Sequence, residues 1–478
     1  MTDQSDRTEM TTLPDPKPTN GSPVFTIDLP DTNHNTDLPD TNHSKDQESV
    51  AYEPYDHRKV KHATSYSETL FHMLKASLGT GILAIPHAFK NSGYLVGIIG
   101  TIVIGLFSCY CIHMMVVAQY VLCKKKKIPS LTYPEIAETA LSEGPPSVRW
   151  LAPYGRIVSF GFLVVCELGA SCIYVIFVAG NLKAVADQYY GDHDIRFYML
   201  LIFFPILLLC WIRNLKLLAP FSTLATAITI ASFGITLYYV FTDVPSISER
   251  NPGGNLKELP LFFGTVMFSM SAIGIIMPLE NEMRSPSKFT SKLGVLNVAM
   301  LSIALIYTGF GFFGYLKYGP STSGSVTLNL PAGDLLAQSV KVMLALAIFC
   351  TFALPQYIVY NIVWNCYLKT HMEKNSLATM WIYVLKTTIC IITFAFAIMI
   401  PNLELFISLI GSLCLPFMAI GLPALTDLIT FWSSHHGLSK ALFITKHVVI
   451  FLIAVVGCYT GVQASVREIL IEVFKVQM

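Results

Sequence analysis

After a polar N-terminal stretch, the sequence consists almost entirely of long apolar runs separated by short polar loops. A helix of about 20 apolar residues spans the hydrocarbon core of a bilayer, and a single soluble core is too small to bury many such helices. We count eleven runs, at residues 68–89, 94–121, 157–181, 197–212, 217–242, 260–281, 293–316, 336–365, 379–400, 403–431 and 442–463. The pattern predicts an all-α integral membrane protein with about eleven transmembrane helices.

The charge composition agrees with a bilayer as the main solvent. Charged residues make up only 13% of the chain, whereas soluble domains average about 25%. The 32 basic and 31 acidic residues nearly cancel, so we expect no nucleic-acid partner. No cluster with metal-ligand spacing and no nucleophile with a matching base stands out, and we therefore expect no metal, no cofactor and no enzyme activity.

The chain divides into three parts. Residues 1–65 are rich in Asp, Asn, Thr and Pro and contain the near-repeat LPDTNHNTD and LPDTNHSKD, which is typical of a disordered tail. Residues 66–465 hold the apolar runs, and residues 466–478 form a short C-terminal tail. Lysine and arginine gather before the first run and in alternate loops, most densely at residues 124–127, which predicts a cytosolic N-terminus and a non-cytosolic C-terminus.

Two of the runs carry small residues at mid-span. These are Gly79, Thr80 and Gly81 in the first run, and Ser269, Ser271 and Gly274 in the sixth. Mid-span glycine serves most often for close helix packing, and less often for a break that exposes backbone polar groups. Two breaks five runs apart are what a five-plus-five inverted repeat produces. Free N–H groups and carbonyls at such breaks suit the carboxylate and ammonium of an amino acid.

Longer motifs surround both breaks: the first run reads HMLKASLGTGILAIPHAFKNSG from His72, and the sixth contains MPLENEM from Met277. These motifs resemble the proton-assisted amino acid transporters of the amino acid/auxin permease superfamily, whose sixth helix carries a similar LPLEN-x-M signature. The resemblance covers about residues 66–465. It implies a LeuT-type fold in which helices 1 and 6 are broken. It also implies proton-coupled import of small neutral amino acids such as alanine, glycine and proline by alternating access.

The same resemblance implies roles for particular residues. It assigns Gly79, Thr80 and Gly81 to the substrate carboxylate, and Ser269, Ser271 and Gly274 to the substrate ammonium. His72 matches the family's first-helix histidine, which is associated with proton coupling, and an imidazole titrates near physiological pH. A structural hydrogen bond is the alternative role for His72. Tyr174 in the third run is a candidate for the pocket wall, or else a packing tyrosine.

A gate at the cytosolic end is a further expectation. Lys75, Glu280 and Glu282 are the candidates, through an ion pair between a glutamate and Lys75 or Arg284. A solvated pair of glutamates is the alternative.

The sequence departs from the family at the break of the sixth run. The family often has an acid followed by glycine there, and this chain has Ser271 and Ala272. Glu167 lies halfway along the third run, where a carboxylate is protonated, paired or facing water. We hypothesise that Glu167 replaces the missing acid, as a proton acceptor or as a partner of His72 or Lys75. A protonated Glu167 with one interhelical hydrogen bond is the alternative.

Other functions stay open at this point. The chain could be a membrane sensor that binds an amino acid, transports little, and engages signalling partners through its tail. It could also be a sodium-coupled or uncoupled amino acid transporter. The plasma membrane and an endolysosomal membrane are equally compatible with the sequence.

Overall fold

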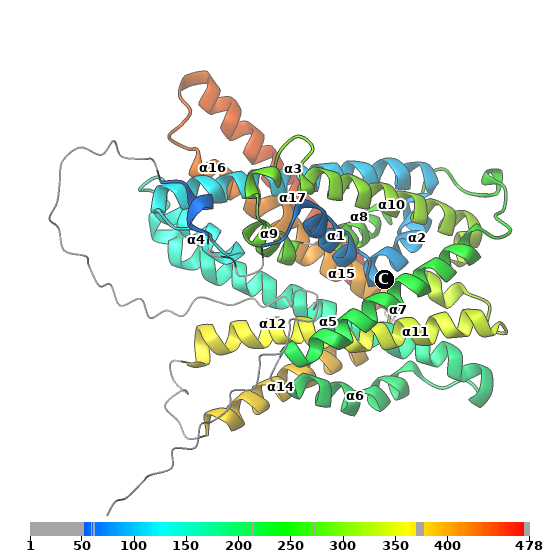
Figure 1. The fold of residues 1–478 in the computed structure, drawn as a ribbon. Helices are drawn as coiled ribbons and strands as arrows, with labels where there is room; N and C mark the ends of the chain where they lie inside the picture. The colour runs from blue at the N-terminus through cyan, green and yellow to red at the C-terminus, as the bar shows by residue number, and fades with distance from the viewer. Residues whose placement is uncertain are drawn as a thin grey trace, which may run out of the picture.

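The computed structural model describes residues 52–58, 60, 63–212, 215–270, 273–369 and 377–472. Regular secondary structure in this part of the chain is helical, apart from one isolated bridge between Thr64 and Met283 (Figure 1). Nine of its helical stretches are long and apolar enough to cross a membrane. Together with one shorter apolar helix and one helix in two parts, they coincide with the eleven predicted runs.

The spans fall into two sets of five and a final helix. The first set is α1 (Tyr66–Ser77) with α2 (Thr80–Ser92), α3 (Tyr94–Lys126), α5 (Ala152–Tyr190), α6 (Ile195–Trp211) and α7 (Leu215–Phe241). The second set is α8 (Leu259–Met270) with α9 (Ile273–Glu282), α10 (Val295–Tyr318), α11 (Leu335–Thr351) with α12 (Ala353–Val363), α14 (Ala378–Met399), and α15 (Leu403–Leu415) with α16 (Leu422–Thr430). The last span is α17 (Gly437–Glu472). Each set therefore opens with a span in two parts, as an inverted repeat requires.

The interrupted spans lie in the middle of the bundle. α8 packs against α2 and α15, and α10 packs against α2 and α3. α6 and α14 lie together at the edge of the bundle, in the lower part of Figure 1. On α6 the side chains of Leu200, Leu201 and Phe204 are each more than 60% exposed, which marks a face for lipid.

Small residues bring α10 unusually close to α2. A Cβ at Gly311 would lie 2.5 Å from Ile85 Cγ2, and a Cβ at Gly314 would lie 2.5 Å from Pro86 Cγ. Any larger residue at either position would force the two helices apart. The glycines of α10 therefore fix its distance from α2, as small residues do between transmembrane helices.

α4 (Tyr133–Glu143) is a helix that the apolar runs did not predict. It packs against α5 and α16 and buries Ile136, Ala137 and Ala140. Its start carries a recognisable signal, because the Thr132 N–H donates to the Glu135 carboxylate at 2.8 Å. A Thr or Ser three residues before a Glu is a known mark of a helix N-terminus, so the sequence could have revealed α4.

Part of the predicted tail also has defined contacts. Residues 52–58, which include the short helix η1 (Pro54–His57), lie on the ends of α3 and α9 that are predicted to be cytosolic. Residues 1–51 and 473–478 lie outside the described residues. The domain boundaries at residues 65 and 466 therefore stay predictions.

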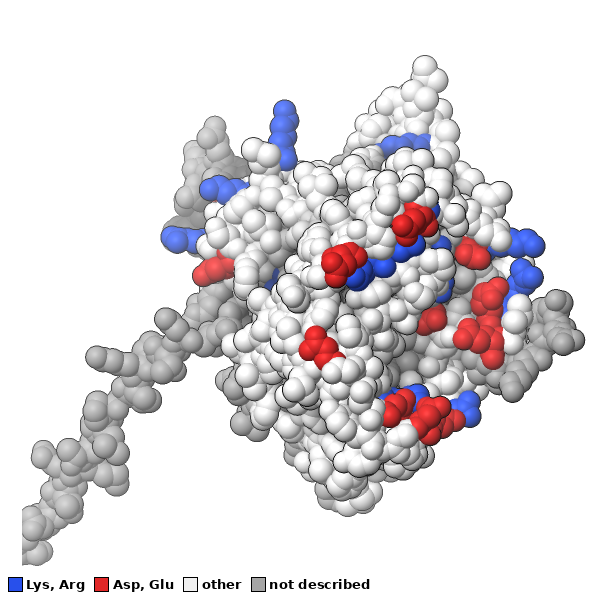
Figure 2. Space-filling model, turned by 90° about the vertical axis from the view of Figure 1, so that its right-hand side faces the viewer, with Lys and Arg blue, Asp and Glu red and all other residues white. Residues whose placement is uncertain are grey.

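The opposite, predicted non-cytosolic end is shown in Figure 2, where acidic and basic side chains lie close together. The loop between α10 and α11 connects three spans at this end. Its Thr327 hydroxyl donates to Asn181 Oδ1 of α5 at 2.9 Å, and Lys341 Nζ of α11 donates to the Leu330 carbonyl at 3.1 Å. Nδ1 of His87 on α2 lies 3.1 Å from the carbonyl of Thr322 in the same loop. These contacts hold the outer ends of α2, α5 and α11 together.

Candidate functional site

The first span is interrupted between Ser77 and Thr80. Leu78 has φ −79° and ψ 75°, which are the angles of an inverse γ-turn, and the Gly79 N–H donates to the Ser77 carbonyl at 2.9 Å. Gly79 is extended, and α2 begins at Thr80. The first N–H groups of α2 therefore have no acceptor within their own helix, and they carry the positive end of its dipole.

The structure brings the two groups of small residues together. The Ser269 hydroxyl of α8 lies 2.9 Å from the Gly81 carbonyl and 2.7 Å from the Thr265 carbonyl, and can donate to either. A Cβ at Gly81 would lie only 2.8 Å from Ser269 Cα. Glycine at position 81 therefore permits α2 and α8 to touch next to the break in the first span.

Alanine at position 81 is expected to destabilise the protein, whereas alanine at position 79 is not. The new methyl group at position 81 would press on the Ser269 backbone, and overpacking of this kind costs about 1–3 kcal/mol. At Gly79 an added Cβ meets no atom within 4 Å. Thermal unfolding of the two purified variants compares them directly. Equal melting temperatures would contradict the contact between α2 and α8.

The carboxylate of Glu167 lies beside the second interrupted span. Its Oε1 is 3.6 Å from the place that a Cβ would take at Gly274, in the first turn of α9. Among the described residues the carboxylate has no hydrogen-bond or ion-pair partner, while the Glu167 carbonyl accepts from the Ser171 hydroxyl at 2.8 Å. Tyr174 lies two turns further along the same face of α5 and is partly buried against the core. Ser271 and Ala272 lie outside the described residues.

His72 and Lys75 lie half-buried on α1, one turn apart. Within the part of the chain that the structure describes, neither side chain has a hydrogen-bond or ion-pair partner, and neither contacts Glu167. Glu68 lies one turn before His72, on the same helix. The structure therefore does not support the predicted pairing of Glu167 with His72 or Lys75. Glu167 lies next to Gly274 of the sixth span, so its role as a proton acceptor that replaces the missing acid there stays a prediction.

The predicted gate has a different partner from the one expected. Glu280 pairs with Arg58, not with Lys75 or Arg284, through Nη1–Oε1 and Nη2–Oε2 contacts of 3.0 and 3.1 Å. Arg58 Nη1 also donates to the Glu280 carbonyl at 3.1 Å, and Arg58 Nε donates to the Pro129 carbonyl at 2.9 Å. The Glu280 side chain is 1% exposed, so it is not the solvated glutamate of the alternative expectation, whereas Glu282 is half-buried. This bidentate geometry is the strong form of an arginine–carboxylate ion pair.

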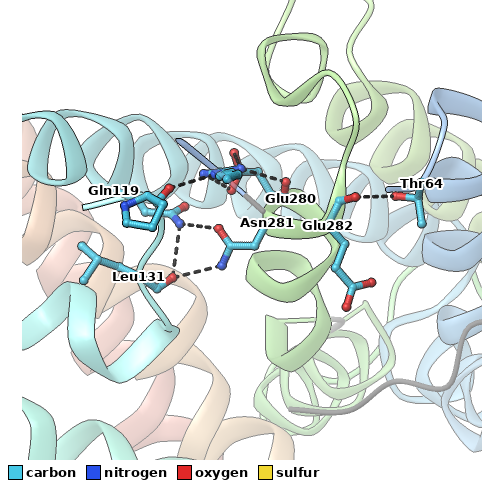
Figure 3. Close-up of polar contacts among 8 residues, drawn as sticks. Thr64, Gln119, Leu131, Glu280, Asn281 and Glu282 are labelled. Atoms are coloured by element: carbon cyan, nitrogen blue, oxygen red, sulfur yellow. Dashed lines mark hydrogen bonds and ion pairs between the residues drawn. The ribbon is translucent and has the colours of Figure 1, made fainter. Parts of the chain in front are cut away.

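A second set of polar contacts lies next to this ion pair (Figure 3). Gln119 Nε2 donates to Asn281 Oδ1 at 2.9 Å, and both side chains donate to the Leu131 carbonyl at 3.2 Å. Glu282 contributes its main-chain carbonyl, which accepts from the Thr64 N–H at 2.9 Å. The C-terminal end of α9 thus forms hydrogen bonds with α3, with the loop before α4 and with the segment before α1.

The segment before α1 is also anchored by aromatic rings. The Tyr55 ring lies 4.8 Å from the Arg58 guanidinium and 4.9 Å from the Tyr120 ring. The Tyr120 hydroxyl donates to the Glu53 carboxylate at 2.8 Å. Burial, with Glu280 as a second cause, raises the pKa of the Tyr55 phenol above its usual value, so this ring packs as a neutral group.

An apolar pocket opens beside Gly79, between α2, α7 and α11. Leu83, Phe233, Leu344 and Ile348 are among its walls, and the one side-chain oxygen in its lining is the hydroxyl of Thr229. Hard cations are held in proteins by several oxygen ligands. The walls of this pocket do not supply such a set from their side chains.

Two sets of five spans, each opening with an interrupted helix, are the architecture of secondary transporters built from inverted repeats. The family described as "Transmembrane amino acid transporter protein" matches residues 62–467, and the chain belongs to this family. It is therefore a multi-pass membrane protein that transports amino acids, and it is not an enzyme.

Individual relatives agree with this assignment. The chain is 35% identical over 419 residues to "Proton-coupled amino acid transporter-like protein pathetic" of Drosophila melanogaster, covering 87% of this chain and 88% of the relative. It is 29% identical over 418 residues to "Amino acid transporter AVT3A" of Arabidopsis thaliana, covering 85% and 90%. The solved structure "Inward facing conformation of Mhp1" matches with a TM-score of 0.55 at 13% identity, covering 90% of this chain and 93% of Mhp1. This last likeness confirms the predicted LeuT-type fold.

Proposed function

We propose that this protein carries small neutral amino acids, such as alanine, glycine and proline, into the cytosol together with protons. The observation that carries the proposal is the Glu167 carboxylate, which lies beside the interrupted sixth span and has no hydrogen-bond or ion-pair partner within the described part of the chain. The fly relative is named a proton-coupled transporter-like protein, which supports the same coupling.

The two ends of the interrupted first span suit the two charges of an amino acid. The N–H groups at the start of α2 attract the carboxylate, and the last carbonyls of α1 attract the ammonium. Glu167 adds a negative charge on the facing side when it is ionised. Ser269, Ser271, Gly274 and Tyr174 complete the surroundings of the substrate in this proposal.

Proton coupling follows from the position of Glu167. A carboxylate at mid-bilayer is costly to leave charged and unpaired, so in this proposal Glu167 takes up a proton for the crossing. The protonated carboxyl can still accept a hydrogen bond from the substrate ammonium through its carbonyl oxygen, so the proton and the amino acid are bound at the same time and cross together. His72 on α1 is the second proton-carrying group in this scheme.

Alternating access needs a gate at the cytosolic end. In the proposed cycle the Arg58–Glu280 ion pair holds this end closed, and substrate release requires α9 to leave Arg58 and the loop before α4. Lys75 of α1 and Glu282 of α9 have smaller roles in this opening.

Uptake is expected to be independent of sodium and to rise in acid. The walls of the apolar pocket beside Gly79 contribute a single side-chain oxygen, that of Thr229, which favours a proton at Glu167 over a sodium ion as the coupled cation. Labelled alanine, glycine and proline should enter cells that express the protein at least about three times faster at pH 5.5 than at pH 7.5. Replacing sodium by a large organic cation should leave these rates unchanged.

Other results would favour other functions. A requirement for sodium would overturn the proton proposal. Binding of alanine without uptake or counterflow in liposomes would instead identify a sensor. Fluorescence microscopy of tagged protein decides between the plasma membrane and an endolysosomal membrane, and uptake is then measured in the membrane that holds the protein.

A further inference from the structure

We propose that Tyr307 of α10 is a positioning residue for transport, because its hydroxyl fixes the backbone at the break in the first span. The inference rests on the proposed function, since the break matters for uptake only if substrate binds there. Tyr307 itself is not expected to touch the substrate.

The contact is direct and fully buried. Tyr307 is 1% exposed, and its hydroxyl donates to the Ser77 carbonyl, the last carbonyl of α1. In an unbroken helix this carbonyl would accept from the N–H of residue 81. The break removes that donor, and the phenol of Tyr307 takes its place, next to the Gly79 N–H that also reaches Ser77.

The other side of the break also contacts a second helix. The Ser269 hydroxyl of α8 lies 2.9 Å from the Gly81 carbonyl and 2.7 Å from the Thr265 carbonyl. The Tyr307 and Ser269 hydroxyls thus lie against the backbone on the two sides of the interruption, from two different helices. The backbone groups between them, around Gly79, stay available to a ligand.

α10 is well placed to set the geometry of the break because it packs against both halves of the first span. Gly311 and Gly314 fix its distance from α2, and the Tyr307 hydroxyl fixes its position relative to the end of α1. The spacing between the last carbonyls of α1 and the first N–H groups of α2 is therefore set before substrate arrives. Such pre-organisation raises affinity because little ordering is left to do on binding.

The same helix supplies a matched control. Tyr315 lies two turns from Tyr307 on α10 and is 3% exposed. Within the described residues its hydroxyl has no hydrogen-bond partner. Tyr307→Phe and Tyr315→Phe each remove one phenol oxygen from a buried residue of α10, and only the first removes a contact with the break.

The experiment is uptake of labelled alanine by the full-length protein, with KM and maximal rate measured for each variant at equal surface amount. Tyr307→Phe should raise KM by about 3- to 10-fold, the effect of one neutral hydrogen bond, with the maximal rate within about twofold. Tyr315→Phe should leave both values unchanged. A lower maximal rate or surface amount with an unchanged KM would show a packing role only and would overturn the proposal.

A double variant adds a second measurement, the coupling between two effects on KM, which a loss of packing alone would not produce. If Tyr307 and Ser269 hold one break, their effects on KM are coupled, so Tyr307→Phe with Ser269→Ala should differ from the product of the single effects by about threefold or more. Tyr315→Phe with Ser269→Ala should equal the product, and additive effects for both pairs would contradict the proposal. Uptake by the unaltered protein tests the proposed function separately, since the positioning role is judged only from ratios between variants.

Discussion

Glutamine at position 167 is expected to abolish the stimulation of uptake by acid, while the protein still reaches the membrane. The amide has the shape of the carboxylic acid but does not titrate, and the side chain lies beside Gly274 with no partner among the described residues that the substitution would remove. Uptake of labelled alanine is measured at pH 5.5 and pH 7.5 at equal surface amount. The ratio of the two rates should fall to about one.

Two further variants sharpen this test. Glu167→Asp keeps a titratable group near the same place and should retain part of the acid stimulation. Glu258→Gln removes an exposed carboxylate just before α8, at the start of the sixth span, and should leave the ratio of the two rates unchanged. If Glu167→Gln keeps the full ratio, the proton does not travel by way of this side chain.

Alanine at position 58 is expected to open the cytosolic end of the protein. It leaves the buried Glu280 carboxylate without the guanidinium that holds it, and loss of one partner of a buried ion pair costs about 3–5 kcal/mol. Because the closed state contains this pair, the cost shifts the equilibrium towards states in which Glu280 meets water. The expected result is faster efflux of preloaded alanine and a reduced ability to hold it against a gradient.

The chain carries its own reporters for this opening. Cys123 of α3 is fully buried and within electrostatic reach of both Arg58 and Glu280, whereas Cys366 is exposed. In Arg58→Ala a thiol reagent should modify Cys123 at least about tenfold faster, while Cys366 reacts as before; mass spectrometry reads the two sites separately. Adding Glu280→Gln removes the unpaired charge and should slow Cys123 again. Equal rates at Cys123 in all three proteins would exclude Arg58 as a gate residue.

The membrane fold could be predicted from the sequence because each span is a long apolar run that depends on no distant contact. The mid-span carboxylate of Glu167 stood out for the same reason, since charges are rare within such runs. That Glu167 lies next to Gly274 was found only in the structure, because positions on different spans are related by packing and not by spacing.

The partner of Glu280 shows where sequence reasoning fails. Lys75 and Arg284 were the expected partners. The actual partner, Arg58, lies in a polar segment without periodicity, and its bond to Glu280 joins residues 222 positions apart. The phenol of Tyr307 was equally hidden, because a tyrosine inside an apolar run looks like any packing residue until its acceptor is known.

The packing of α2 also bears on how the protein is made. α2 leaves the ribosome early, yet two of the helices that it packs against, α8 and α10, begin only at Leu259 and Val295. Until then the Ser77 carbonyl at the end of α1 lacks the Tyr307 phenol, and the backbone groups at such a break are costly to leave in lipid. Both halves of the chain consist of five spans that open with an interrupted helix, but the first half is not a folding unit by itself. Its opening helix reaches its final place only after the second half has been synthesised, which makes assembly of this transporter a late, whole-chain event.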